Sequence, residues 1–316
     1  MAVFISDPRR DDLAARLSTV VVLLAVMFIG ITGCWRIQTQ TCKPKSGSSL
    51  PNGPRQSVLP LSVHEVGGVT VDTAGNVYVL DWGCDAPGRP GFLEGVQVVE
   101  LASGSGTQAV LPFTGLNGYG DVAVSTAGDV YVTNAADNQV RKLAAGSRSQ
   151  TVLPFTGLHH PGGVAADGAG NVYVSDEINN RVVALAPGPG TQRVLPFTGL
   201  DGPTALAVDG AGNVYVVENN RVLELAPGSS TQTVLPFTGL DHPRGVAVDG
   251  AGDVYVADSR NNRVLKLPTG SSTQTLLPFT GLNEPWSVAV DTAGNVYTET
   301  RDMDFDSYHV LKLAAG

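Results

Sequence analysis

The chain has 316 residues and a formal net charge of -9, with 42% hydrophobic and 16% charged residues. Its 38 Gly and 20 Pro residues exclude a helical bundle, and its apolar content excludes a disordered chain. The acidic balance and the absence of a Lys/Arg run give no electrostatic footprint for nucleic acid. We therefore expect a fold of strands and turns with no nucleic-acid partner.

The first 33 residues resemble a bacterial lipoprotein signal peptide. Arg9, Arg10 and Arg16 precede an uncharged apolar run over residues 17–32, which is short for a membrane span of roughly 20 residues. The run ends at Cys34 in a sequence that resembles a lipobox, which predicts that Cys34 is lipidated before the leader is cleaved. An uncleaved anchor and an ordinary secretory signal remain alternatives. All three predict export, and the first two predict a bilayer anchor on the outer side of the cell membrane.

Residues 34–54 are rich in Lys, Pro, Ser and Gly, which is typical of a flexible tether. If Cys34 carries lipid, Cys42 and Cys84 remain as an even pair in an oxidising compartment. We expect a disulfide between them, with two free thiols as the alternative.

Residues 55–316 repeat one unit of about 42 residues. An Ala-Gly-Asn/Asp-Val-Tyr block recurs six times, with its glycine at Gly75, Gly128, Gly170, Gly212, Gly252 and Gly294. A Leu-Pro block recurs in the same register, at Pro60, Pro112, Pro154, Pro196, Pro236 and Pro278. Such a period indicates that one structural unit is repeated six times.

Each unit predicts four short strands, for example residues 245–249, 253–257, 263–267 and 275–278. Four strands per unit predict an all-β, six-bladed β-propeller. The chain opens with a fourth-strand block at residues 57–61 and ends with a third-strand block at residues 310–313. We therefore predict that the N-terminal strand completes the last blade, which removes exposed sheet edges. We also expect the six second-strand Tyr and the five Phe of the linking segments to be blade core.

The segment from Pro243 to Leu267 resembles the NHL repeat. The linking Leu-Pro-Phe-Thr-Gly-Leu segments resemble the extracellular sensor domain of the mycobacterial receptor-type Ser/Thr protein kinase D family. This resemblance implies a rigid extracellular propeller in a ligand-sensing or anchoring role. The chain contains no kinase motif, so direct signalling to the cytoplasm is not implied.

Enzymes such as amidating lyases and metal-dependent lactonases also occur among six-bladed propellers, so we searched for metal ligands. Glu65, His160 and His242 precede the first strand in blades one, three and five, where a divalent ion is conceivable. Backbone capping in a turn is the simpler interpretation of these positions. The Asp302, Asp304 and Asp306 series lacks the Gly and Glu of an EF-hand, although a looser calcium site stays open. We expect no catalytic residues and no cofactor, and we prefer a binding, sensing or scaffold module.

The Asp-x-x-Asn-Asn-Arg segment occurs at residues 176–181 and again at residues 258–263. Because a repeated segment is more simply explained by a repeated turn, we favour a structural role over a ligand site. Departures from the repeat are better candidates for function. Off-pattern aromatic residues fall in loops that emerge on one face of blades six, one and two, namely Trp82, Phe92, Tyr119, Trp286, Phe305 and Tyr308. Off-pattern acids lie in or beside the same loops, namely Glu65, Asp85, Glu94, Glu284, Glu299, Asp302, Asp304 and Asp306.

Aromatic anchors rimmed by carboxylates suit a peptide, a saccharide or a cationic partner. We therefore predict that a monomer binds a cell-envelope protein, peptide or saccharide on this face. Packing of the aromatic residues within their own loops is the alternative.

Overall fold

In five of the six repeats an Asp side chain fixes the hairpin turn between the first two strands, and the second repeat has Ser125 at this position. Asp72 Oδ1 accepts hydrogen bonds from the backbone N–H groups of Ala74 and Asn76, at 2.9 and 2.8 Å. Gly75 takes a φ of 82°, which favours glycine at this step of the turn. Tyr78 donates its hydroxyl hydrogen to Asp72 Oδ2 at 3.1 Å. The repeated sequence block therefore sets the turn and the position of the buried Tyr together.

The computed structural model describes residues 53, 55–86, 89–188, 190–302 and 307–316. For residues 84–86 and 89–94 it describes the backbone alone. The predicted signal peptide, the tether, Cys34 and Cys42 lie outside the described residues. None of the described helices is long and apolar enough to cross a membrane. The described residues all belong to one compact unit, Gln40–Gly316.

The described chain forms six four-stranded antiparallel sheets. Blade one comprises β2 (Val66–Val71), β3 (Val77–Asp81), β6 (Gln97–Leu101) and β7 (Gln108–Val110). Blade two comprises β8 (Val122–Val124), β9 (Val130–Asn134), β10 (Gln139–Leu143) and β11 (Gln150–Val152). Blade three comprises β12 (Pro161–Ala166), β13 (Val172–Asp176), β14 (Arg181–Leu185) and β15 (Gln192–Val194). Blade four comprises β16 (Ala205–Val208), β17 (Val214–Glu218), β18 (Arg221–Leu225) and β19 (Thr233–Val234). Blade five comprises β20 (Pro243–Val248), β21 (Val254–Asp258), β22 (Arg263–Leu267) and β23 (Thr275–Leu276). Blade six comprises β24 (Val288–Val290), β25 (Val296–Arg301), β26 (Tyr308–Leu313) and β1 (Gln56–Val58).

The remaining elements lie in loops between second and third strands. A two-stranded hairpin of β4 (Cys84–Ala86) and β5 (Arg89–Glu94) forms within the longer loop of blade one. Short 3-10 turns, η1 (Ala135–Asp137) and η2 (Ser259–Asn261), occupy the same loop of blades two and five. These loops all emerge at the same end of their blades.

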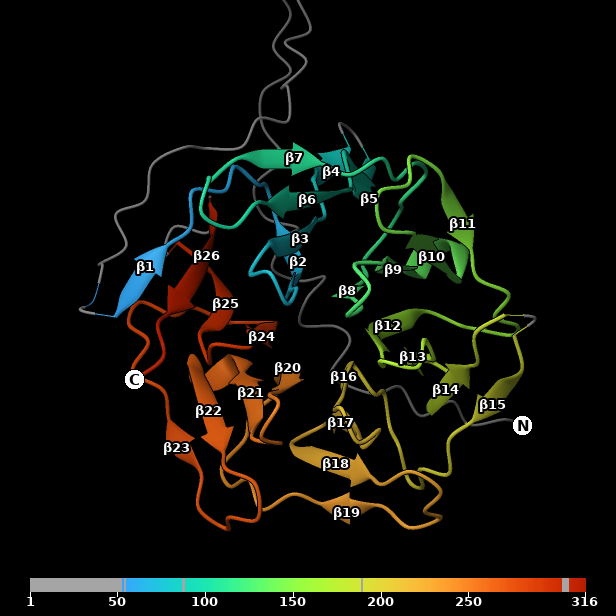
Figure 1. Ribbon diagram of the computed structural model, residues 1–316, viewed down its shortest axis with the longest axis vertical. Helices are drawn as coiled ribbons and strands as arrows, with labels where there is room; N and C mark the ends of the chain where they lie inside the picture. Colours follow the sequence, from blue (N-terminus) through green and yellow to red (C-terminus); the bar gives the residue numbers. More distant parts are fainter. Residues whose placement is uncertain (1–52, 54, 87–88, 189, 303–306) are drawn as a thin grey trace, which may run out of the picture. The chain divides into compact units, whose positions relative to one another are not determined.

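The six sheets form a closed ring (Figure 1), and their inner strands line a central channel. The innermost strands contact one another in the order β2, β8, β12, β16, β20 and β24, and β24 contacts β2 again. The all-β, six-bladed propeller predicted from the repeat period is confirmed. Because the first strand of every blade lines the channel, a side chain at the start of such a strand reaches the channel mouth.

The ring is closed by the N-terminal strand, as predicted. Strand β1 pairs antiparallel with β26, and Gln56 lies opposite Leu313. Gln56 is buried, and its side-chain amide accepts a hydrogen bond from Thr280 N at 2.8 Å and donates one to Thr280 O at 3.0 Å. Blade six therefore takes strands from both ends of the described chain.

The same clasp joins the other blades to the segments that lead into them. A Gln at the start of the outermost strand, or directly before it, bonds the backbone of a Thr or Ser in the preceding connection, in the pairs Gln108 and Ser62, Gln150 and Thr114, Gln192 and Thr156, Gln232 and Thr198, and Gln274 and Thr238. The recurring Gln therefore fastens each outer strand to the connection that enters its blade.

Hydrophobic side chains form the core between adjacent sheets. One cluster combines Tyr173 and Val182 of blade three with Leu206 and Leu223 of blade four. All six second-strand Tyr are buried, with relative exposures of 2–6%, so their assignment to the core is confirmed. The prediction for the linking Phe residues is wrong in part: Phe155, like the others, follows the fourth strand and packs half-buried at the margin of a cluster.

The recurring Asp-x-x-Asn-Asn-Arg segments are structural turns, as expected. Asp176 accepts hydrogen bonds from His159 N at 2.7 Å, Asn179 Nδ2 at 2.8 Å and Arg181 Nε at 2.6 Å. Asn180 takes a φ of 51°, and its side chain accepts a hydrogen bond from Gly202 N in the next connection at 2.8 Å. The buried Asp therefore organises the end of its own blade, while the left-handed Asn holds the neighbouring one.

Candidate functional site

The inner strands approach one another closely at a ring of small residues. Five blades place Gly, Ala or Ser at equivalent positions near the start of the first strand, namely Gly68, Gly163, Ala205, Gly245 and Ser287. A Cβ atom on Gly245 would lie 2.7 Å from the Cα atom of Ser287, which leaves no room for a larger side chain without a shift. Blade two carries Asp121 at this position, so a single carboxylate interrupts the ring.

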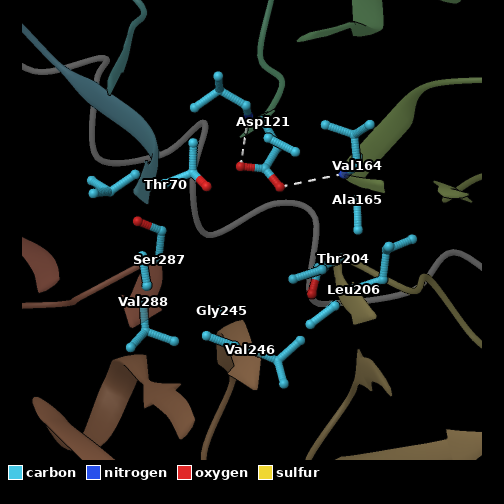
Figure 2. Close-up of a pocket in the computed structure, with 18 of the residues that line it drawn as sticks. Thr70, Asp121, Val164, Ala165, Thr204, Leu206, Gly245, Val246, Ser287 and Val288 are labelled. Atoms are coloured by element: carbon cyan, nitrogen blue, oxygen red, sulfur yellow. Dashed lines mark hydrogen bonds between the residues drawn. The ribbon is translucent and has the colours of Figure 1, made fainter. Parts of the chain in front are cut away.

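The channel contains a cavity of about 440 Å³. Figure 2 shows its wall, where inner-strand residues such as Thr70, Val164, Leu206 and Val288 surround the opening. Larger side chains line the end at which the inner strands begin, namely Trp82, Tyr119, His160, Glu177, Arg244 and Trp286. We call this end the mouth.

Three aromatic rings from consecutive blades contact one another at the mouth. Trp82 of blade one lies edge-to-face with Tyr119 before blade two, with centroids 4.6 Å apart and an interplanar angle of 80°. The other neighbour of Trp82 is Trp286 before blade six, at 5.3 Å and 68°. The Trp82 indole also donates a hydrogen bond from Nε1 to Gly120 O at 3.3 Å. These three rings, which we call the aromatic wall, cover the blade six, one and two side of the mouth.

The members of the aromatic wall differ in exposure. Trp82 is only 4% exposed and packs into a core cluster, whereas Tyr119 is 42% exposed and Trp286 is half-buried. The guanidinium carbon of Arg244, from blade five, lies 4.4 Å from the centroid of the Trp286 ring. The wall therefore has a buried anchor and two accessible rings, one of which already carries a cation.

Asp121 lies one residue beyond Gly120, inside the channel and next to the aromatic wall. Its Oδ1 accepts a hydrogen bond from Val122 N at 2.8 Å, and its Oδ2 accepts a longer one from Val164 N at 3.4 Å (Figure 2). Desolvation raises the pKa of this carboxyl from 3.8 to about 7; the two backbone N–H groups oppose the rise, and the charge of Glu299 adds to it. Near neutral pH, Asp121 therefore exists as a mixture of acid and carboxylate.

A second carboxylate is buried behind the wall of blade six. Glu299 is 1% exposed and accepts hydrogen bonds from Ser287 N at 2.8 Å, from Ser287 Oγ at 2.6 Å and from Trp286 N. Burial raises the pKa of Glu299, and these hydrogen bonds oppose the rise. Glu299 therefore fixes the backbone that carries Trp286 and contributes negative charge near the channel.

Four other residues predicted for the ligand-binding face are described, and their side chains have partners outside this cavity. Tyr308 donates a hydrogen bond to Glu65 at 3.2 Å, Glu284 forms an ion pair with Arg301, and Asp302 lies 3.1 Å from His309 Nε2. Among the side chains described, those of Tyr308, Glu65, Glu284 and Asp302 do not line the cavity. The side chains of Phe92, Asp85 and Glu94 and the residues Asp304, Phe305 and Asp306 lie outside the description.

The metal site considered at Glu65, His160 and His242 is not assembled. Within the described residues, no three His, Cys, Asp or Glu side chains are grouped as metal ligands. His160 Nδ1 lies 2.7 Å from Glu177 Oε2, and His242 Nδ1 lies 2.8 Å from Asp241 Oδ1. His160 N donates to Asn138 Oδ1 and His242 N donates to Asn220 Oδ1, which agrees with the capping interpretation of these positions.

Sequence reasoning missed Asp121, Glu177 and Arg244. The signal for two of them was available, because Asp121 replaces the small residue of the inner ring and Arg244 stands where blades one to three have Gly. Glu177 gave no such signal, since it follows the buried Asp176 in an ordinary turn.

Comparisons with known proteins support the fold. The family model of the NHL repeat matches residues 240–267, which lie in the fifth blade and the connection before it. No curated protein matches the chain significantly.

Several solved structures are similar. A chain in a nidogen–laminin complex aligns with a TM-score of 0.62 and 19% identity, over 72% of this chain and 85% of that one. Streptogramin B lyase aligns with a TM-score of 0.60 and 14% identity, over 81% and 96%. Virginiamycin B lyase from Staphylococcus aureus aligns with a TM-score of 0.58 and 14% identity, over 83% and 98%. At these identities the likeness concerns the fold alone: the described chain is a six-bladed β-propeller with an NHL repeat in blade five.

Proposed function

We propose that the protein is an exported, membrane-anchored binding or scaffold propeller that recognises a partner at the mouth of its channel. The observation that carries this proposal is the aromatic wall of Trp82, Tyr119 and Trp286 beside a cavity of about 440 Å³. Concave sites with accessible aromatic rings and a few polar groups are typical of ligand binding. A peptide, a saccharide or a loop of a cell-envelope protein would fit such a surface.

The exposure of Tyr119 supports a recognition role. Tyr119 is one of seven large hydrophobic residues found exposed in the described chain, and it belongs to the aromatic wall. Aromatic rings at interfaces supply a large contact area with few rotatable bonds, and they are enriched among residues that dominate binding energy. A ring held in place by a buried Trp is already ordered before the partner arrives.

Export and anchoring are supported by the leader sequence. Residues 17–32 are uncharged and apolar and follow three Arg residues, and Cys34 stands at the position expected for lipid attachment. The resemblance to the sensor propellers of mycobacterial receptor kinases agrees with an extracytoplasmic location. We propose that Cys34 is the lipid-bearing N-terminus and that Cys42 bonds to Cys84. Intact-mass analysis of membrane-extracted protein, with and without reductant, tests both assignments.

The alternative function is a lyase or hydrolase with its site at the channel mouth. Asp121 favours this alternative, because a carboxyl with a pKa of about 7 inside a channel is suited to exchange protons near neutral pH. The streptogramin B lyase and virginiamycin B lyase neighbours are enzymes by name, but their likeness extends only to the fold. Metal analysis of the purified full chain tests a metal-dependent form of this activity, which would require stoichiometric metal.

The binding proposal is tested by replacing Tyr119 with Ala in the full chain. Arrays of synthetic peptides and of bacterial cell-envelope saccharides would be probed with the wild-type protein and with Tyr119→Ala. We expect binding to fall at least tenfold with little change in Tm, because Tyr119 is 42% exposed. Ile178→Ala is the control, since Ile178 is a 57% exposed apolar residue in the turn between β13 and β14 of blade three and does not line the cavity.

The structure changes which variants are informative. Trp82 and Tyr308, which sequence reasoning suggested as exposed anchors, are buried and half-buried, so their replacement by Ala would lower stability as well as binding. Equal binding by wild type and Tyr119→Ala on every array that gives a signal would contradict the proposed site.

A further inference from the structure

The charge of Asp121 is not matched by a cation. Among the described residues, no Lys, Arg or His pairs with its carboxylate, which accepts only two backbone hydrogen bonds. Three other buried acids of the same propeller, Asp176, Glu218 and Asp258, each pair with an Arg, whereas Glu299 accepts hydrogen bonds from Trp286 and Ser287. A partly buried carboxylate that faces a cavity without a counter-ion is favourably placed to bind one from solution.

The aromatic wall above Asp121 offers surfaces that attract cations. Arg244 already lies over the Trp286 ring at 4.4 Å, within the range of a cation–π contact. Tyr119 is accessible beside it and is separated from Asp121 by Gly120 alone. An ammonium group that entered beside Tyr119 would pass this aromatic ring before it reached the carboxylate.

The charges around the channel also favour a cation on the blade two side. Glu299 adds negative charge to the environment of Asp121. The positive Arg244 belongs to blade five, which lies opposite blade two in a ring of six, and His160 is held by Glu177 at 2.7 Å. Asp121 and Arg244, the two charged residues of the cavity that form no ion pair among the described residues, therefore lie on opposite walls.

We propose that the channel binds a small organic ammonium ion, with the ammonium group on the Asp121 carboxylate beneath the aromatic wall. This inference rests on the proposed function and names the chemical class of its ligand. A cavity of about 440 Å³ limits the ligand to a small molecule or to one projecting side chain. Cation–π contact and a charge-assisted hydrogen bond or ion pair are the interactions that select it over a neutral molecule.

The test uses choline, phenethylammonium and a neutral analogue of choline, 3,3-dimethylbutan-1-ol, titrated into the full chain by calorimetry. We expect at least one of the two ammonium ions to bind, and the neutral alcohol to bind at least tenfold more weakly than choline if choline is the ligand. Asp121→Asn should weaken ammonium binding at least tenfold. Asp201→Asn is the matched control, because it removes one exposed acid that does not line the cavity, and it should change binding less than twofold.

Asp121→Ser provides a second variant, since blade six carries Ser287 at the same position. If neither ammonium ion binds, or if both Asp121 variants bind like wild type, the inference is overturned. In that event the array experiment still decides the proposed function, because the effect of Tyr119→Ala on peptide or saccharide binding does not depend on Asp121. A Lys-containing peptide and its acetylated form, compared in the same titration, distinguish a side-chain ammonium from a free small molecule.

Discussion

Replacing Asp121 by Asn removes a charge that the folded channel holds at a cost. In the folded protein, desolvation raises the pKa of this carboxyl from 3.8 to about 7. Asn has nearly the same shape, and its carbonyl oxygen can still accept the 2.8 Å hydrogen bond from Val122 N. The longer contact from Val164 N, at 3.4 Å, is the only hydrogen bond of the side chain that the substitution puts at risk.

The direction of the effect follows from proton linkage. Between pH 4 and 7 the folded protein keeps the Asp121 proton while the unfolded chain releases it, so the free energy of unfolding falls as the pH rises. A rise in pKa from 3.8 to about 7 corresponds to ~4 kcal/mol at 1.36 kcal/mol per pH unit. Because Asp121 faces a cavity that water enters, screening reduces this value, and we expect about 2 kcal/mol.

We therefore expect Asp121→Asn to be close to wild type in stability at or below pH 4 and more stable by about 2 kcal/mol at pH 8. Urea unfolding at a series of pH values, followed by Trp fluorescence, gives the difference directly. Carboxyls whose pKa is lowered in the folded state, such as Asp167 and Asp291, also make stability depend on pH. Because they are present in both proteins, their contribution cancels in the difference between wild type and variant. A difference that does not change with pH, or a variant less stable than wild type at pH 8, would refute the reasoning.

Three further outcomes test the ring and its channel. Gln56→Ala should lower the free energy of unfolding by about 1–3 kcal/mol, because it removes a buried clasp that closes the ring, and more than Gln232→Ala, whose clasp is exposed. Gly245→Ala should cost about 1–3 kcal/mol by overpacking against Ser287, while Gly250→Ala, where a Cβ atom meets nothing within 4 Å, should cost much less; thermal unfolding measures both. Choline affinity should rise between pH 6 and 8 as Asp121 ionises, and the affinity of Asp121→Asn for choline should not change over this range. The other titratable or charged groups near the cavity are Glu299, Glu177, His160 and Arg244.

The repeat made most of the fold predictable, because each repeated block does one local task. The Asp-x-Ala-Gly turn fixes a hairpin, the Tyr behind it enters the core, and the position of the first Leu-Pro block predicts that β1 joins β26. The repeated Gln escaped notice because its role is not local. Gln192 bonds Thr156 in a connection 36 residues away, and only the curvature of the ring brings those residues together.

The site was predictable only in part, because a departure from a repeat reveals an unusual residue but not where its side chain goes. Trp82, Tyr119 and Trp286 meet because they flank the inner strands of adjacent blades, which the ring order implies. Tyr308 departs from the pattern equally, yet it lies on a third strand and turns toward Glu65. Tyr308 lies farther from the channel axis than the three rings of the aromatic wall, because the third strand of a blade is farther out than the first. The position of a residue in the repeat does not by itself give this distance.

Close packing of the inner ring explains why so few departures suffice to make a site. A Cβ atom on Gly67 would lie 1.9 Å from the Trp82 ring, so the Gly is what allows the indole to lie across the start of the inner strand. In the same way, Asp121 Oδ1 fills the space in front of Gly68, 2.4 Å from where a Cβ atom would be. Two side chains at the mouth therefore depend on a glycine that leaves them room: Trp82 depends on Gly67 of its own blade, and Asp121 depends on Gly68 of the neighbouring blade. The binding chemistry that we propose is set by a few large or charged side chains that depart from the repeat and lie against its glycines, and the repeat supplies the rigid frame that holds them in register.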